Sequence, residues 1–230
     1  IKNAFSSAES HSEKMLRAMD LNSEQLSRFQ KLLSHIVFPI PELRTNSAII
    51  AKNTLSQSGL WSFGISGDYP ILLVMIDHHE EIEALQESML AHSYWRKLGL
   101  LIDLVIVNTK DTGYEHELNE KINQAITKME LQKWVNSRGG IFILTASQMK
   151  QESMFLLQSA AKVVLDLKAD DLESHLKKAE AIEPNLPAFI STGDDEEYRV
   201  EKSIPRPEEL ILDNGIGGFS KDGREYKIFM

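Results

Sequence analysis

The sequence contains no cysteine, only 7 prolines and 12 glycines among 230 residues, and no long apolar run. Without cysteine the chain cannot form a disulfide scaffold, a cysteine–zinc site, a thiolate nucleophile or an iron–sulfur cluster. A membrane-spanning helix needs about 20 consecutive apolar residues, and no segment of the sequence supplies them. Ile1–Ser10 is also too polar to be a secretory signal.

Basic residues are few as well. There are 25 Lys and Arg against 34 Asp and Glu, which gives a formal charge of −9. Nucleic-acid binding depends on clustered Lys and Arg, so the charge argues against a nucleic acid as partner. Residues 170–202 hold ten acidic and four basic side chains, a net charge of −6. We interpret residues 170–204 as an acidic helix followed by a solvated connector.

Hydrophobic residues make up 42% of the chain, which is enough for a folded core. Residues 1–58 predict an N-terminal helical segment. Asn22 and Gln25 have the spacing of a capping box, in which Asn22 caps the helix and Gln25 reaches back to it. Apolar residues then recur at helical spacing as far as Ile36, and Pro39 and Pro41 end the pattern.

Four apolar runs alternate with helical patterns between residues 59 and 169. The runs are Ile71–Ile76, Leu101–Val107, Ile141–Leu144 and Val163–Leu167. Strands that are apolar throughout and separated by helices are typical of a parallel sheet covered on both faces. We therefore predict an α/β domain over residues 59–169, with a Rossmann-like four-stranded parallel sheet and helices on both faces.

Residues 205–230 change character again and predict strands and turns around the glycine-rich Asn214–Gly218. The chain begins at Ile1 and stops within the strand-like Tyr226–Met230. We therefore expect it to be a fragment of a longer polypeptide.

The loop Gly64–Asp68 invites three interpretations. A serine-hydrolase elbow needs glycine where Asp68 stands, and the serine must follow a strand. A phosphate loop must also follow a strand and open a helix, whereas this loop precedes a strand. The third interpretation is a tight loop leading into the strand, whose glycines adopt positive φ. We prefer the third, with ligand contact by Trp61, Ser66, Gly67 and Asp68 as the alternative.

The loop after the first strand is Asp77–Glu81. It contains three carboxylates and no glycine, which argues against a nucleotide pyrophosphate at this position. We expect Asp77 to cap the following helix. His78 and His79 have no third ligand at zinc-like spacing, so we predict no metal site. Asn108, Thr145 and Lys168 after the later strands form an incomplete set for a phosphoacceptor receiver.

Several aromatic and histidine side chains could contact a ligand. His92 lies on the apolar stripe of its helix, where a hydrogen-bonded core histidine is the simpler interpretation. Trp95 ends the same helix, and Trp61 stands apart from the helical patterns. Sugar stacking is open to tryptophan, although aromatic residues at helical spacing usually pack in a core.

The sequence resembles cyclic β-1,2-glucan synthases, which are very large bacterial membrane proteins. The matching segments are Leu60–Val74, Ala91–Leu100, Asp103–Asn108, Gly139–Leu144, Asn214–Phe219 and Asp222–Tyr226. Together they extend over most of the chain, and the acidic stretch departs most from the family.

The resemblance implies a parent with a membrane-embedded glycosyltransferase that uses UDP-glucose and a divalent metal. It also implies a C-terminal region similar to cellobiose phosphorylases, and the last motif here looks like the opening strands of its β-sandwich. No catalytic residue of that family falls on this chain, for which we expect no catalytic residue, metal or cofactor of its own. The parent would lie at the cytoplasmic face of the bacterial inner membrane.

Three hypotheses follow. The first is a non-catalytic connector that positions neighbouring domains of the same polypeptide in β-glucan synthesis. The second is a module with its own carbohydrate or sugar-phosphate site, with β-glucan as a partner. Its candidate ligand-binding residues are Trp61, Ser66, Gly67, Asp68, His92 and Trp95. The third is a protein-interaction scaffold that docks partners on the helices within Leu21–Ile36 and His79–Leu98.

Overall fold

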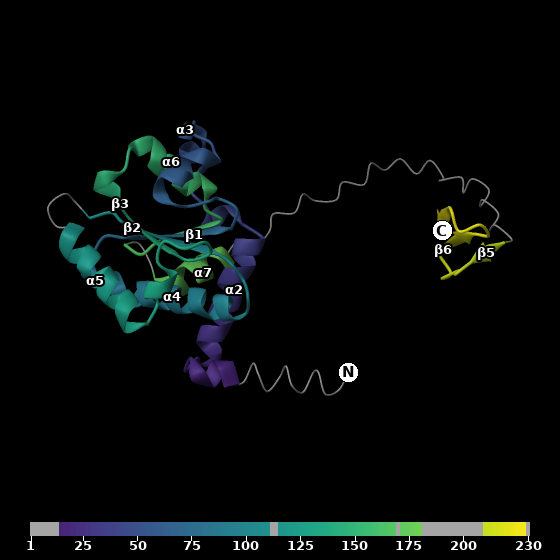
Figure 1. The fold of residues 1–230 in the computed structure, drawn as a ribbon, viewed down its shortest axis with the longest axis horizontal. Coiled ribbons are helices and arrows are strands. Elements are labelled where there is room, and N and C mark those ends of the chain that lie inside the picture. Colours follow the sequence, from purple (N-terminus) through teal and green to yellow (C-terminus); the bar gives the residue numbers. More distant parts are fainter. Residues whose placement is uncertain (1–13, 111–114, 169–170, 181–208, 229–230) are drawn as a thin grey trace, which may run out of the picture. The chain divides into compact units, whose positions relative to one another are not determined.

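The computed structural model describes residues 14–110, 115–168, 171–180 and 209–228 (Figure 1). By its internal contacts the chain divides into two compact units, Ile1–Glu183 and Pro184–Met230, and each is described by itself. Among the described residues no helix combines the length and the apolar character needed to cross a membrane.

The first unit is built on a parallel sheet of β1 (Ile71–Ile76), β2 (Asp103–Asn108), β3 (Ile141–Thr145) and β4 (Val163–Asp166). The strand order is β3-β2-β1-β4. The predicted four-stranded parallel sheet is therefore confirmed. Each strand begins and ends within two residues of the apolar run that predicted it.

One face of the sheet is covered by α2 (Ser23–Val37), α4 (Ile82–Lys97), α5 (Glu115–Lys128) and α7 (Leu172–Glu180). Alternate residues of β1 point to this face, among them Leu72 and Val74. They pack with buried side chains of the helices, such as Leu85 of α4 and Ile122 of α5. In Figure 1 these helices lie on the same side of the sheet.

The opposite face is covered by α3 (Ser47–Lys52), the 3-10 helix η2 (Gln57–Phe63) and α6 (Gln151–Ala160), which lie together above the sheet in Figure 1. Leu73 of β1 and Phe142 of β3 point to this face and pack with Leu157 of α6. Both faces are therefore buried, which explains why the strands are apolar at every position. The predicted arrangement of helices on both faces is confirmed.

The N-terminal helices belong to the same unit as the sheet. The capping box of α2 is confirmed, because Gln25 N donates to Asn22 Oδ1 at 2.8 Å and Asn22 N donates to Gln25 Oε1 at 3.1 Å. Phe29 and Ile36 of α2 are buried in the same core as side chains of α4 and α7. α2 therefore packs into the same core as the sheet, and the boundary expected at residue 58 stays a prediction.

Short 3-10 helices complete the connections of the first unit. They are η1 (Pro41–Leu43), η3 (His79–Glu81), η4 (Gln132–Trp134) and η5 (Ala146–Gln148). The acidic region after the sheet begins with α7, which accounts for the helix expected there. The expected connector over residues 181–204 lies outside the described residues.

The second unit is a small antiparallel sheet with the order β5-β6-β7. Its strands are β5 (Leu210–Ile211), β6 (Gly217–Ser220) and β7 (Tyr226–Ile228). The rings of Phe219 and Tyr226 meet edge to face, with centroids 4.9 Å apart. The strands expected in this region are confirmed, and their place in a β-sandwich stays a prediction.

Candidate functional site

The loop between η2 and β1 brings four of the predicted site residues together. Trp61 Nε1 and Gln57 Nε2 both donate to the carbonyl oxygen of Ser66, at 3.2 and 2.9 Å. The Ser66 hydroxyl in turn accepts the backbone N–H of Asp68 at 3.2 Å. The Ser66 carbonyl thus ties Trp61 and Gln57 to the chain just before β1.

Gly67 permits this arrangement in two ways. Its φ of +76° lies in the left-handed region, which residues other than glycine rarely adopt. A Cβ atom at Gly67 would also lie 2.7 Å from Gln57 Cγ. The Gln57 side chain can therefore lie against the backbone only because residue 67 is glycine. Gly64 has a φ of +75°, so the predicted tight loop with positive-φ glycines is confirmed.

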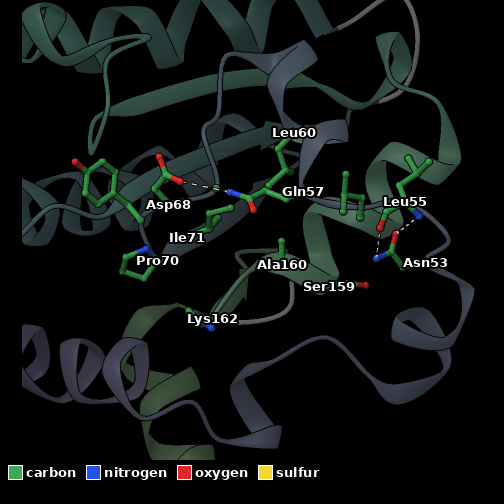
Figure 2. Close-up of a pocket in the computed structure, with 13 residues that line it drawn as sticks. Asn53, Leu55, Gln57, Leu60, Asp68, Pro70, Ile71, Ser159, Ala160 and Lys162 are labelled. Atoms are coloured by element: carbon green, nitrogen blue, oxygen red, sulfur yellow. Dashed lines mark hydrogen bonds between the residues drawn. The ribbon is translucent and has the colours of Figure 1, made fainter.

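A cavity of about 500 Å³ opens beside this loop at the amino edge of the sheet (Figure 2). Its walls come from the α3–η2 region, from the residues that lead into β1, and from the end of α6. The lining residues are Asn53, Leu55, Gln57, Leu60, Gly67, Asp68, Tyr69, Pro70, Ile71, Leu156, Ser159, Ala160 and Lys162. Figure 2 shows Gln57 extended toward Asp68, with Ser159 and Lys162 on the α6 side. The volume falls within the range of about 300–1,000 Å³ that small-molecule sites have.

One wall of the cavity contains an unsatisfied polar group. The hydroxyl oxygen of Ser159 is buried and has no hydrogen-bond partner in the described structure. Arg44 Nη2 donates to the backbone carbonyl of the same residue at 2.8 Å, while its Nε is also buried without a partner. Buried polar atoms nearly always have partners, so this wall has hydrogen-bonding capacity that the protein itself leaves unused.

The charge of Asp68 is balanced within the site. Arg138 Nη2 lies 2.7 Å from Asp68 Oδ2, and the Arg138 guanidinium stands 5.5 Å from the centre of the Tyr69 ring. Both charged side chains are more than half exposed, so solvent weakens the pair. Lys162 is the other charged residue that lines the cavity. With Asp68 balanced by Arg138, Lys162 leaves the site with one net positive charge.

Asp103 is a perturbed group that the sequence analysis did not single out. Only 1% of its surface is exposed. Burial raises the pKa of its carboxyl to about 6, against the opposing effect of the hydrogen bond from Gly139 N, which donates to Oδ1 at 2.8 Å. The other carboxylate oxygen has no partner in the described structure. The available signal was one acidic residue inside the apolar run Leu101–Val107.

His92 and Trp95 belong to α4 and are buried on the face of the sheet that α4 covers. Neither residue lines the cavity. His92 Nε2 donates to the carbonyl oxygens of Ile102 and Gly139, at 3.0 and 3.1 Å, and burial lowers the pKa of its imidazole. Trp95 Nε1 donates to Phe29 O at 3.3 Å. Both side chains are buried, so their position in the structure is that of hydrogen-bonded core residues.

The carboxyl edge of the sheet is the usual ligand position in a Rossmann-like fold, between the strands where the order reverses. These strands are β1 and β4, and there Lys168 Nζ lies 2.8 Å from Asp77 Oδ2. The expected helix cap by Asp77 is wrong, because η3 begins after His78 and Asp77 N donates to Glu81 Oε2 at 2.8 Å. Asp77 is engaged by Lys168 instead of by helix N–H groups.

Polar side chains at the ends of β2 and β3 also bond at this edge, through Asn119 of α5. Asn108 donates to Asn119 Oδ1 at 2.9 Å, and Asn119 donates to Thr145 Oγ1 at 3.0 Å. Within the described ranges there is no group of three or more His, Asp or Glu side chains that could hold a metal ion.

Comparisons with known proteins agree with the motif-based resemblance. No family model matches the sequence. The chain is 26% identical over 231 residues to the cyclic beta-(1,2)-glucan synthase NdvB of Rhizobium meliloti (strain 1021). The match covers 94% of this chain but spans only 8% of the length of NdvB. The predicted similarity to a cyclic β-1,2-glucan synthase is therefore confirmed.

Proposed function

We propose that this chain is a non-catalytic connector module of a larger polypeptide that takes part in β-1,2-glucan synthesis. The observation that carries the proposal is the match to NdvB, which extends over 94% of the chain and 8% of the relative. The module would set the spacing of neighbouring domains at the cytoplasmic face of the bacterial inner membrane. UDP-glucose and a divalent metal would be bound by other parts of that polypeptide.

The arrangement of helices supports a positioning role. In the sequence, α2 lies near the beginning of the first unit and α7 near its end. In space the two helices pack against each other. Arg28 of α2 strengthens this corner, because it lies 2.7 Å from Glu87 of α4 and 3.9 Å from Glu173 of α7. A module whose entering and leaving helices are held together can be inserted between two domains at a fixed spacing.

The chemistry of the cavity supports a non-catalytic role. Glycoside chemistry normally uses two carboxylates that flank the reacting bond. Among the described residues that line the cavity, Asp68 is the single acid, and Arg138 neutralises it. Asp103 is too deeply buried to reach a substrate.

A second candidate function, carbohydrate binding by this module, is favoured by the cavity at the amino edge of the sheet. The interaction-scaffold hypothesis is not retained. It relied on the apolar faces of α2 and α4, and these bury Phe29, Leu85 and Trp95 within the unit itself.

The test uses a Rhizobium meliloti strain without NdvB, complemented by NdvB in which the matching segment is replaced by this chain. We expect this chimaera to make cyclic β-1,2-glucan. Deleting residues 71–167 from it should lower the yield or change the size of the product. Normal glucan from the deletion variant would rule out a positioning role, and no glucan from the intact chimaera would rule out the synthase role.

A further experiment on the same chimaera addresses catalysis directly. Loss of a catalytic carboxylate costs on the order of a thousandfold or more in rate. We expect Asp68→Asn and Asp103→Asn to change the rate of glucan synthesis less than tenfold. A thousandfold loss at normal protein level would show that the module contributes a catalytic group.

A further inference from the structure

We infer that the cavity at the amino edge of the sheet, together with the neighbouring Trp61, binds a neutral glucan chain. The choice of β-1,2-linked glucose as the sugar rests on the proposed function. The inference of a polyhydroxyl ligand rests on the lining of the cavity and on one exposed aromatic ring.

The lining of the cavity matches the surface of a sugar ring. A pyranose has apolar C–H faces and a rim of hydroxyl groups. Leu60, Ile71 and Leu156 supply an apolar surface, while the polar lining residues belong to two separate walls. Small-molecule sites have this composition, with a mostly apolar lining and a few polar groups that fix orientation.

The first polar wall is the pair of Gln57 and Asp68. Gln57 is held in place by its hydrogen bond to Ser66 O, and its amide lies 3.5 Å from Asp68 Oδ1. Arg138 binds the other carboxylate oxygen, Oδ2. Oδ1 therefore has only one long contact, and it can accept the hydrogen of a sugar hydroxyl. Hydrogen bonds to an ionised group are about twice as strong as those between neutral groups.

The second polar wall is the end of α6. The buried hydroxyl of Ser159 has no partner in the described structure, although it lines a cavity large enough for a ligand. A hydroxyl can donate and accept one hydrogen bond at the same time, as sugar hydroxyls do. Because this oxygen has almost no accessible surface, the Ser159 side chain would have to rotate to bond a glucosyl residue in the cavity.

Trp61 extends the site beyond the cavity. Its side chain is on the protein surface, with 64% of the residue exposed. Its indole N–H already donates to the Ser66 carbonyl, which also holds Gln57 of the cavity wall. The ring is therefore fixed next to the cavity without an unsatisfied polar group, as a stacking surface requires. A ligand that reaches both Trp61 and the cavity must have more than one sugar unit.

The experiment titrates the 230-residue chain with linear β-1,2-linked glucotetraose in an isothermal titration calorimeter. Gln57→Ala, Asp68→Asn and Trp61→Ala should each weaken binding at least tenfold. Gln132→Ala is the matched control, because Gln132 is the first residue of the 3-10 helix η4 as Gln57 is of η2, and it should leave binding unchanged. Thermal unfolding of each variant verifies that it is folded.

Each outcome decides the inference. No binding of glucotetraose, or equal binding by all four variants, would overturn it. Tighter binding of glucose 1-phosphate or UDP-glucose than of glucotetraose would overturn its neutral-ligand part. If the NdvB chimaera makes cyclic glucan while the chain binds none, the inference fails and the proposed function stands. If the chimaera makes none, the proposed function fails whatever the titration gives.

Discussion

Lys168 Nζ lies 2.8 Å from Asp77 Oδ2, across the junction of β1 and β4 where the strand order reverses. In a Rossmann-like domain this junction normally receives the ligand. Here an ion pair between two residues of the chain occupies it, and the adjacent Asn108 and Thr145 are linked through Asn119. The carboxyl edge is stabilised by its own side chains, and the open cavity lies at the opposite edge.

The Asp77–Lys168 pair predicts a pH-dependent loss of stability in Asp77→Asn. Asp77 is only 15% exposed, and its hydrogen bond with Lys168 lowers the pKa of its carboxyl. A carboxyl whose pKa is lower in the folded state stabilises that state at pH values above its unfolded-state pKa, which is about 3.9. This stabilisation is lost as the pH falls through the pKa of the folded state. At pH 7 we expect Asp77→Asn to cost about 1 kcal/mol of unfolding free energy.

Urea unfolding followed by tryptophan fluorescence measures this cost, because all three tryptophans lie in the first unit. As the pH falls below the unfolded-state pKa of about 3.9 and through the lower pKa of the folded state, the stabilities of the variant and the parent chain should converge. Glu209→Gln, in the second unit, is the control and should not change the transition. A cost that persisted unchanged at low pH would mean that the charge of Asp77 is not its source.

Gly67→Ala is expected to be more damaging than an ordinary substitution at a positive-φ glycine. The left-handed conformation alone costs a residue with a side chain about 1–2 kcal/mol. At Gly67 the new Cβ would also meet Gln57 Cγ at 2.7 Å, whereas at Gly99, with a φ of +81°, it would meet nothing within 4 Å. Gly67→Ala should therefore lower the unfolding free energy by more than Gly99→Ala does.

A double-mutant cycle isolates the contact. In the Gln57→Ala background the Cγ atom is absent, so Gly67→Ala should cost no more than Gly99→Ala. If the cost of Gly67→Ala were the same in both backgrounds, the close approach of Gln57 would have no energetic role.

The strands could be predicted from the sequence because both faces of the sheet are covered. Burial on both faces requires an unbroken apolar run, and each run from Ile71–Ile76 to Val163–Leu167 became a strand. The strand order could not be predicted, because it depends on which strands pack beside one another. It places β4 next to β1, which joins Lys168 to Asp77.

The candidate site was predictable only where it is continuous in sequence. Trp61, Ser66 and Asp68 lie within eight residues, and the structure joins Trp61 to the Ser66 carbonyl and Asp68 to the Ser66 hydroxyl. Ser159 and Lys162 reach the same cavity only through the packing of α6 on the sheet, which no local pattern records. His92 was ambiguous because a core histidine and a ligand-binding histidine can occupy the same helical stripe.

Asp103 predicts a dependence on pH opposite in sign to that of Asp77. Burial raises the pKa of its carboxyl to about 6 in the folded state, so the folded chain holds this proton more tightly than the unfolded chain does. The contribution of Asp103 to the unfolding free energy is therefore greatest below about pH 4. It is lost as the pH rises through the folded-state pKa of about 6. From the size of the shift, the total loss is about 3 kcal/mol.

Asp103→Asn removes this titration and keeps an oxygen that can accept the N–H of Gly139, the bond now made by Oδ1 at 2.8 Å. The parent chain should therefore lose stability relative to the variant between about pH 4 and pH 7. Urea unfolding at intervals across this range measures the difference, which depends on Asp103 alone because every other carboxylate is common to both chains. Parallel stability curves would mean that Asp103 titrates in the folded chain as it does in the unfolded one.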